Sequence, residues 1–244
     1  MGRLIGSSAS PSSAPESAGR PNLLGALRED ERQALERVAQ LHLLRRGHTL
    51  YVSADLKGAI CILRSGRLKL ARLSRDGREF ILEIVEPGAL FGHLSTSEDP
   101  VPETIAEAFE DSLVLAVSRA EFEAFLRGRP DLALMVVKSI DLRLRSTESR
   151  MEDLVFRDIP GRLANALLRL ADTYGIATDG GVSVGFRITQ QELANLIGAS
   201  REMVNHTLSG LRRKGVVALK GRTIIIRQRE ALEGLREAGH RPHA

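Results

Sequence analysis

The sequence contains one cysteine, Cys61, and this scarcity excludes several kinds of protein. A single cysteine cannot form a disulfide within the chain, and it cannot supply a four-cysteine zinc or iron–sulfur site. Cys61 falls in an expected strand, where we predict a buried and unreactive thiol. The low cysteine content fits a reducing compartment, and we expect a cytoplasmic protein.

Long apolar runs are also missing. Runs such as residues 134–137 and 224–226 are far shorter than the roughly 20 residues that cross a bilayer. The N-terminus has no apolar stretch of the length found in signal peptides. We therefore predict neither a membrane span nor a secretory leader.

The formal charge of +4 is small, but it is distributed unevenly along the chain. Up to Phe156 there are 21 basic and 23 acidic residues, whereas from Arg157 onward there are 14 basic and 8 acidic residues. A basic C-terminal part after a slightly acidic N-terminal part indicates contact with a polyanion such as DNA or RNA.

The N-terminal half divides into a tail, a helical segment and a strand-rich segment. Residues 1–21 are small, polar and proline-rich, which predicts a disordered tail. In a region spanning 22–118, apolar residues from Leu23 to Leu41 recur at helical spacing and predict a helix pair. From His48 to Ser118 the pattern alternates and is broken by glycines, which predicts an antiparallel barrel or jelly roll of about eight strands.

Two strands of this segment can be oriented from the sequence. Leu68 and Leu70 alternate with Lys69, and Phe80, Leu82 and Ile84 alternate with Glu79 and Glu83, as expected for strands with one face on a core. Between them, Asp76-Gly77 predicts a two-residue hairpin turn.

Residues 119–156 return to a helical period, with a break at Pro130. An apolar stripe steps by three and four residues, which is the spacing of a coiled-coil seam. We predict that two copies of the chain pair along this helix; the alternative is that the stripe packs on its own barrel. The predicted dimer interface consists of Val137, Ile140, Leu144, Thr147, Met151 and Leu154.

Residues 157–244 hold the motif that indicates a function. After an apolar helix over 161–174, Thr189 and Glu192 form a capping-box pair, so a helix is expected to begin at Gln190. Gly198 can end that helix in the left-handed conformation, and Ser200 can cap a second helix. A helix, a tight turn and a second helix form a helix-turn-helix, which places the second helix in the major groove of DNA.

In the second helix Val204, Leu208 and Leu211 form an inward stripe, which leaves a polar face outward. Arginine, carboxylate and asparagine side chains match the hydrogen-bonding edges of guanine, cytosine and adenine. Downstream, residues 216–219 and 223–227 predict two strands with a basic turn, a small wing that could contact phosphates. The predicted DNA-binding residues are Thr189, Gln191, Ser200, Arg201, Glu202, Asn205, His206, Ser209, Arg212, Arg213, Lys214, Lys220 and Arg222.

From about Leu41 to Arg229 the chain resembles the catabolite activator and fumarate-nitrate regulator (CRP/FNR) superfamily. The resemblance is carried by the turn at 88–92, by the segments 155–163 and 188–194, and by 198–204. It implies an α+β architecture: an N-terminal cyclic-nucleotide-binding-like β-roll, a long dimerisation helix and a C-terminal winged helix-turn-helix. It also implies a homodimeric transcription regulator, by family habit an activator, with double-stranded DNA, a second copy and RNA polymerase as partners.

The sequence departs from the cyclic AMP-binding members of this family. These members use an Arg-Ser pair after the glycine-rich turn and a glutamate at the turn, whereas this chain has no Arg or Lys between Gly92 and Ser118. Glu98, Asp99, Glu103, Glu107, Glu110 and Asp111 add negative charge instead. We therefore predict no cyclic AMP site. Members that read a TGTGA-type half-site match Arg201 and Glu202 but carry arginine at the position of His206, so the preference at the corresponding base pair should relax or change.

Other functions receive little support from the residues. No nucleophile elbow, phosphate-binding Gly-Lys-Ser/Thr loop or pair of metal-binding histidines is present, so we predict no enzyme activity. His42, His48 and His93 are isolated, and we predict no metal, haem or other cofactor. A regulator of the same fold that is gated by haem or by a small molecule stays open, as does, with less support, a regulatory subunit of an enzyme.

Overall fold

The computed structural model describes residues 21–51, 55–56, 59–92 and 104–239. The predicted N-terminal tail lies outside the described residues except for Pro21. His93 also lies outside the described residues, as do three of the acidic residues near the expected effector site, Glu98, Asp99 and Glu103.

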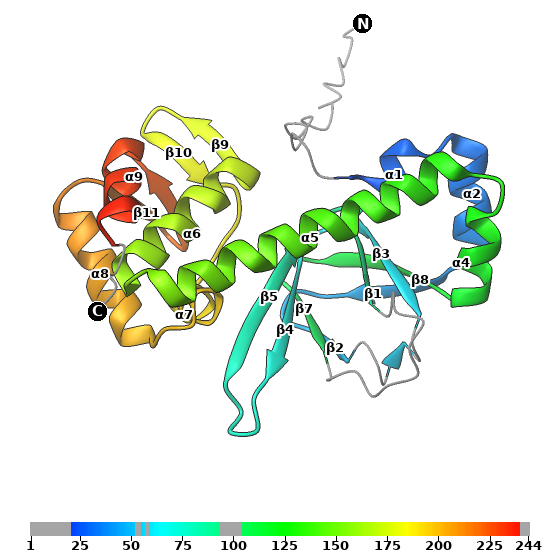
Figure 1. Ribbon diagram of the computed structural model, residues 1–244, viewed down its shortest axis with the longest axis horizontal. Coiled ribbons are helices and arrows are strands. Elements are labelled where there is room, and N and C mark those ends of the chain that lie inside the picture. The colour runs from blue at the N-terminus through cyan, green and yellow to red at the C-terminus, as the bar shows by residue number, and fades with distance from the viewer. Residues whose placement is uncertain (1–20, 52–54, 57–58, 93–103, 240–244) are drawn as a thin grey trace, which may run out of the picture.

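Among the described residues, the N-terminal half forms an antiparallel roll of eight strands, as predicted (Figure 1). Its strands form two four-stranded sheets in the orders β1-β8-β3-β6 and β2-β7-β4-β5. Leucine, valine and alanine side chains of both sheets fill the space between them. The elements are α1 (Leu23–Ala26), α2 (Glu29–Val38), β1 (Gln40–Leu44), β2 (Thr49–Tyr51), β3 (Ile60–Ser65), β4 (Leu68–Leu73), β5 (Glu79–Val85), β6 (Leu90–Gly92), β7 (Ile105–Ala108) and β8 (Ser112–Val117).

Two local predictions in the roll are wrong. Leu41 is predicted to be helical, but α2 ends at Val38. Leu41 therefore lies in β1, where it pairs with Leu115 of β8. The turn between β4 and β5 is longer than two residues, since Leu73 pairs with Glu79 and the Ser74 N–H donates to the Arg78 carbonyl. Gly77 has a φ of 78°, which closes this longer loop in the left-handed conformation.

The outer face of the β2-β7-β4-β5 sheet is covered, contrary to the simple alternation expected from the sequence. Lys69 is only 4% exposed, and its ammonium lies 2.9 Å from Glu79 and 3.0 Å from Glu107. In β5, Ile81 is fully buried and packs near Leu196 of the C-terminal half. A register irregularity between Leu70 and Ala71 accompanies this change. One face of the sheet is therefore buried in the roll, and part of the other face is buried against the C-terminal half.

A short helix, α4 (Arg119–Leu126), and a long one, α5 (Pro130–Phe156), follow the roll, with the break at Pro130 as predicted. Proline begins α5 at a position where its missing N–H leaves no hydrogen bond unmade. The long helix runs from the roll to the C-terminal half (Figure 1). Leu132 is its one fully buried residue.

The C-terminal half packs around α6 (Ile159–Tyr174), whose apolar face is buried. The helix-turn-helix and the two-stranded wing are present as predicted. A second hairpin, β9–β10, and the C-terminal helix α9 were not predicted. The hairpin completes a four-stranded sheet in the order β11-β12-β10-β9. The remaining elements are β9 (Gly175–Thr178), β10 (Gly181–Val184), α7 (Gln190–Ile197), α8 (Arg201–Arg213), β11 (Val217–Lys220), β12 (Thr223–Ile226) and α9 (Arg229–Ala238).

Cys61 lies in β3 and is fully buried, as predicted. Burial raises the pKa of the Cys61 thiol to about 12, so the thiol stays protonated at neutral pH and is a poor nucleophile. Within the described part of the chain, no helix is both long and apolar enough to cross a membrane.

Candidate DNA-binding interface

The two helices of the helix-turn-helix begin and end where the sequence predicts. The Thr189 hydroxyl accepts from the Glu192 N–H at 3.1 Å, and the Glu192 carboxylate accepts from the Thr189 N–H at 2.6 Å. Gly198 ends α7 with φ 62° and ψ 48°, a conformation that suits glycine. The Ser200 hydroxyl caps α8 by accepting from the Met203 N–H at 3.3 Å. Local hydrogen bonds therefore fix the angle at which α8 leaves the turn.

The position of α8 is fixed by its inward stripe. Val204, Leu208 and Leu211 are buried in one core with α6 and α7, together with the wing residues Val217 and Ile224. Burying such side chains stabilises the fold by roughly 1.5 to 3 kcal/mol each. The opposite face of α8 is consequently held outward as a rigid surface.

The outward face of α8 carries the polar residues that the sequence predicts for base contacts. Arg201, Glu202, Asn205 and His206 are exposed, and Ser209 is half-buried. A hydrogen bond from its own backbone N–H, and a second from Ser200, lower the pKa of Glu202. Its carboxylate is therefore ionised and able to accept from a base amino group.

Hydrogen bonds orient two of the amide side chains near this face. The Gln190 Nε2 donates to the Asn205 Oδ1 at 3.1 Å, so the acceptor atom of the Asn205 side chain is engaged by α7. Gln191 donates to Asn195 at 2.8 Å, and Asn195 donates to Glu79 of the roll at 3.1 Å. Gln191 is exposed, and through Asn195 its side chain is connected to Glu79 of the roll.

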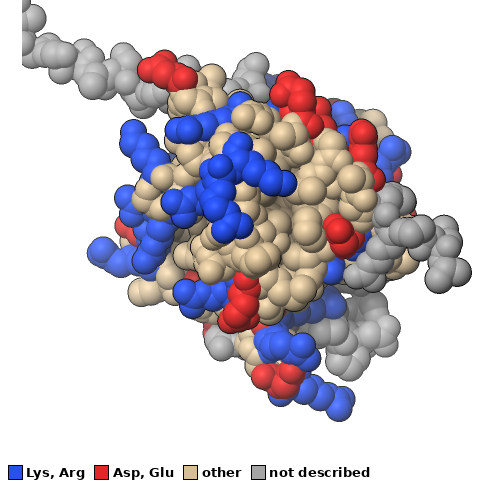
Figure 2. All heavy atoms as spheres, turned by 90° about the vertical axis from the view of Figure 1, so that its left-hand side faces the viewer, with Lys and Arg blue, Asp and Glu red and all other residues tan. Residues whose placement is uncertain are grey.

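Basic side chains surround α8. Arg212, Arg213 and Lys214 are exposed at its C-terminal end, and Lys220 and Arg222 are exposed on the wing turn. Figure 2 shows this end of the molecule, where Lys and Arg gather and Asp and Glu are sparse. The structure therefore brings the predicted residues together on one end of the molecule, with Thr189 half-buried in its capping role.

Two residues of this surface were missed by the sequence analysis. Met203 is 49% exposed on α8, between the polar residues, and it offers an apolar contact such as a thymine methyl group accepts. Arg187 is exposed and lines a hollow with Lys220 and Arg222, between the two hairpins of the wing sheet. The exposure of Met203 could have been inferred from helical spacing, because Met203 does not belong to the inward stripe of α8. The exposure of Arg187 depends on the β9–β10 hairpin, which was not predicted.

The predicted dimer stripe on α5 is exposed in the single chain. Val137, Leu144 and Met151 are each more than half exposed, and Thr147 is exposed while its hydroxyl donates to the Arg143 carbonyl at 2.9 Å. Most of the stripe is therefore not covered by the chain's own roll, whereas Leu154 at its end lies beside Gly198 and lines the junction of the two halves. Its exposed apolar members are Leu134, Val137, Ile140, Leu144, Met151, Leu154 and Val155, of which Leu134 and Val155 were not predicted.

The described acidic residues near the expected effector site have hydrogen-bond or ion-pair partners within the roll. Glu107 pairs with Lys69, and Glu110 lies 3.3 Å from Arg67. The Asp111 carboxylate accepts from the Arg46 N–H at 2.9 Å. Within the described residues, no group of three or more His, Cys, Asp or Glu side chains is placed to hold a metal ion.

Both halves of the chain match known domain families. Residues 41–129 match the cyclic nucleotide-binding domain, and residues 161–235 match the Crp-like helix-turn-helix domain. The chain is similar to a CRP-like cAMP-activated global transcriptional regulator of Mycobacterium tuberculosis (strain ATCC 25618 / H37Rv), with 35% identity covering 77% of this chain and 84% of that one. It is also similar to the cyclic AMP receptor protein of Thermus thermophilus, with 32% identity covering 80% of this chain and 87% of that one.

Solved structures show the same fold. The structure of a CooA mutant from Carboxydothermus hydrogenoformans superposes with a TM-score of 0.75 and 23% identity, covering 88% of this chain and 95% of that one. FixK2 from Bradyrhizobium japonicum superposes with a TM-score of 0.67 and 24% identity, covering 81% and 97%. The arrangement of roll, long helix and winged helix-turn-helix is therefore shared with these proteins.

Proposed function

Since the chain belongs to the CRP/FNR family of DNA-binding transcription regulators, we propose that it binds a two-fold symmetric promoter site as a homodimer and activates transcription there. The observation that carries this proposal is the exposed polar face of α8 beside the basic wing. In a homodimer, two copies of α8 enter successive major grooves about one helical turn apart.

The site residues divide into two roles in this proposal. Arg201 and Glu202, at the N-terminal end of α8, read a guanine and a neighbouring cytosine, with Asn205 and His206 reading adjacent bases. Gln191 and Ser209 flank them. The phosphate backbone is held by the basic residues of the α8 end and the wing, Arg212, Arg213, Lys214, Lys220 and Arg222.

Dimerisation rests on the exposed stripe of α5. An uncovered apolar seam of this length is unusual for a monomer, and a second copy offers a matching surface by two-fold symmetry. The seam spacing of three and four residues suits packing of two parallel helices. The cytoplasm is the compartment in which such a dimer would meet both DNA and RNA polymerase.

We also propose that the protein does not respond to cyclic AMP, although both of the relatives named above carry cyclic AMP in their names. No Arg or Lys lies between Gly92 and Ser118 to hold a cyclic phosphate. Lys69 and Arg67 of the neighbouring strand are already paired with Glu107 and Glu110. Calorimetric titration tests this directly, and micromolar binding of cyclic AMP would overturn it.

Selection of bound DNA from a random pool tests the main proposal. We expect a two-fold symmetric motif with half-sites about 10 base pairs apart. Transcription in vitro from a template carrying that motif upstream of a promoter then tests activation, with RNA polymerase alone as the control. A protein that stays monomeric and selects no sequence would contradict the proposal.

A further inference from the structure

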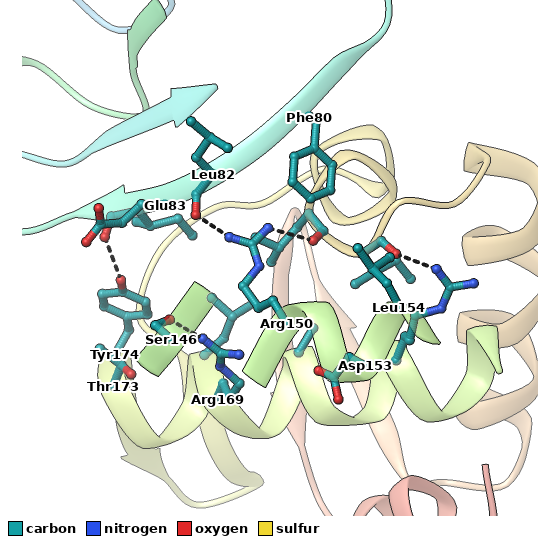
Figure 3. Close-up of a pocket in the computed structure, with 16 residues that line it drawn as sticks. Phe80, Leu82, Glu83, Ser146, Arg150, Asp153, Leu154, Arg169, Thr173 and Tyr174 are labelled. Carbon is teal, nitrogen blue, oxygen red and sulfur yellow. Dashed lines mark hydrogen bonds between the residues drawn. The ribbon is translucent and has the colours of Figure 1, made fainter. Parts of the chain in front are cut away.

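A cavity of about 90 Å³ lies where the two halves of the chain meet (Figure 3). Its walls come from β5 of the roll, from α5, and from α6 and α7 of the DNA-binding half. It is separate from the roll interior and from the exposed face of α8. Its apolar lining includes Phe80, Leu82, Leu154, Leu170 and Leu196.

Arg150 reaches into this cavity from α5. Its guanidinium donates to the carbonyls of Ile81 and Leu82 in β5, and to that of Leu196 in α7 at 3.1 Å. It also lies 5.3 Å from the centroid of the Phe80 ring. One cation thus joins the backbones of the roll and of the helix-turn-helix.

Arg150 forms no direct ion pair with an acidic residue of the described part of the chain. Among the described residues, no carboxylate lies within 4.0 Å of its guanidinium. The two acidic residues of the cavity wall are engaged elsewhere, Glu83 with Arg143 at 3.0 Å and Asp153 with Arg157 at 2.7 Å. Arg150 is half-buried, and the charges of Glu83 and Asp153 act on it only from beyond ion-pair distance. A bound anion would supply a direct counter-ion.

The hydrogen-bonding capacity of Arg150 is also not exhausted. A guanidinium has five N–H donors, and the three carbonyls use three of them. Burial, and then the nearby charge of Arg169, lower the pKa of Arg150 to about 10, which leaves it fully charged at neutral pH. Arg162 and Arg169 line the same cavity and add positive charge.

We propose that this cavity binds a small organic anion, with its carboxylate or phosphate facing Arg150 and its apolar part against Phe80, Leu82 and Leu196. The volume sets the size, because about 90 Å³ is smaller than a cavity of roughly 150 Å³ that is known to hold a benzene ring. The ligand is therefore a short-chain acid that is smaller than a benzene ring.

The position of the cavity gives such an anion a route to regulation, a step that rests on the proposed function. A ligand that touches both β5 and α7 favours the arrangement in which the helix-turn-helix is docked on the roll. The affinity for DNA then changes with the ligand, and by linkage the affinity for the ligand changes with DNA.

The experiment titrates the full chain with acetate, propionate and methyl phosphate, with propionamide as the neutral match of propionate. We expect propionate or methyl phosphate to bind saturably at millimolar concentration or below and to raise the Tm, and propionamide to do neither. Arg150→Gln should weaken binding at least tenfold. Arg145→Gln, a change on the exposed side of the same helix, should leave binding unchanged because Arg145 is outside the cavity.

A second variant keeps the test decisive if Arg150→Gln does not fold. Ala166 lines the cavity, and Ala166→Leu fills it without touching the hydrogen bonds of Arg150, so this variant should fold and lose anion binding. The proposal would be overturned if no anion bound the wild-type chain, or if both cavity variants bound the anions as tightly as the wild type does. Because these titrations contain no DNA, their outcome is independent of the operator selection above.

Discussion

The helices α5 and α8 both leave one face uncovered, but the chemistry of the two faces differs. The seam of α5 is apolar, with Val137 and Met151 more than 60% exposed. The outward face of α8 is polar and charged, and its buried residues lie on the opposite side. Water solvates the α8 face well and the α5 seam poorly, so the seam calls for a second apolar surface and the α8 face for a polar, anionic one. The contrast separates self-association from nucleic-acid binding within one chain.

Leu144→Glu is expected to have the largest effect, because it places an unpaired carboxylate in the centre of the seam. Burying that charge costs several kcal/mol, so the dissociation constant of the dimer should rise by at least about 100-fold. Sedimentation equilibrium measures the change. Glu148→Ala, an exposed change on the same helix, is the control and should leave the dimer intact. A Leu144→Glu protein that still sediments as a dimer would show that α5 is not the interface.

Arg201→Ala tests the face of α8. It should lose about 1 to 3 kcal/mol of discrimination at one base pair, because a bidentate contact to guanine disappears. Competition binding with operators changed at single positions measures this loss. An equal loss on every DNA sequence would mean that Arg201 contacts phosphate and reads no base.

Arg213→Ala should have a smaller and more uniform effect. Arg213 lies at the C-terminal end of α8, away from the end expected to contact bases. Its removal should therefore weaken binding to all DNA sequences equally. The slope of log affinity against log salt concentration should fall by about one. A loss of discrimination at a single base pair would instead mean that Arg213 reads a base.

Cys61 is fully buried, in contrast to these two exposed faces. Its replacement is expected to have the smallest effect of these changes at neutral pH. Unfolded, the thiol ionises near its ordinary pKa of 9.0, whereas burial raises the pKa in the folded state to about 12. Ionisation therefore favours the unfolded chain between these values, and stability should fall by about 1.4 kcal/mol per pH unit above pH 9.

Unfolding by urea at pH 8 to 11 measures this slope against Cys61→Ala. The variant should lack the contribution of Cys61 to the slope while remaining close to the wild type in fold at pH 8. Equal slopes for the two proteins would mean that the thiol is accessible to solvent in the folded state. Iodoacetamide should then modify the native wild-type chain, which we do not expect.

The sequence was sufficient for features that depend on near neighbours. The capping pair Thr189 and Glu192, the left-handed Gly198 and the cap at Ser200 each rest on contacts within about four residues, and all were predicted and are present. The hairpin at Asp76-Gly77 shows the limit of such reasoning. A two-residue and a longer loop use the same residue types, and pairing of the flanking strands selects between them.

Tertiary structure alone decided how the two halves meet. Lys69 and Phe80 occupy positions of an amphipathic strand, and nothing near them in the chain indicates that the outer face of their sheet is covered. Arg150 contacts carbonyls 68 and 46 residues away, and those distances along the chain carry no periodic signal. Local pattern therefore determined the fold class and the candidate DNA-binding face. The junction and its cavity emerged from the packing of elements that are remote in sequence, because a side chain's environment depends on what is folded against it.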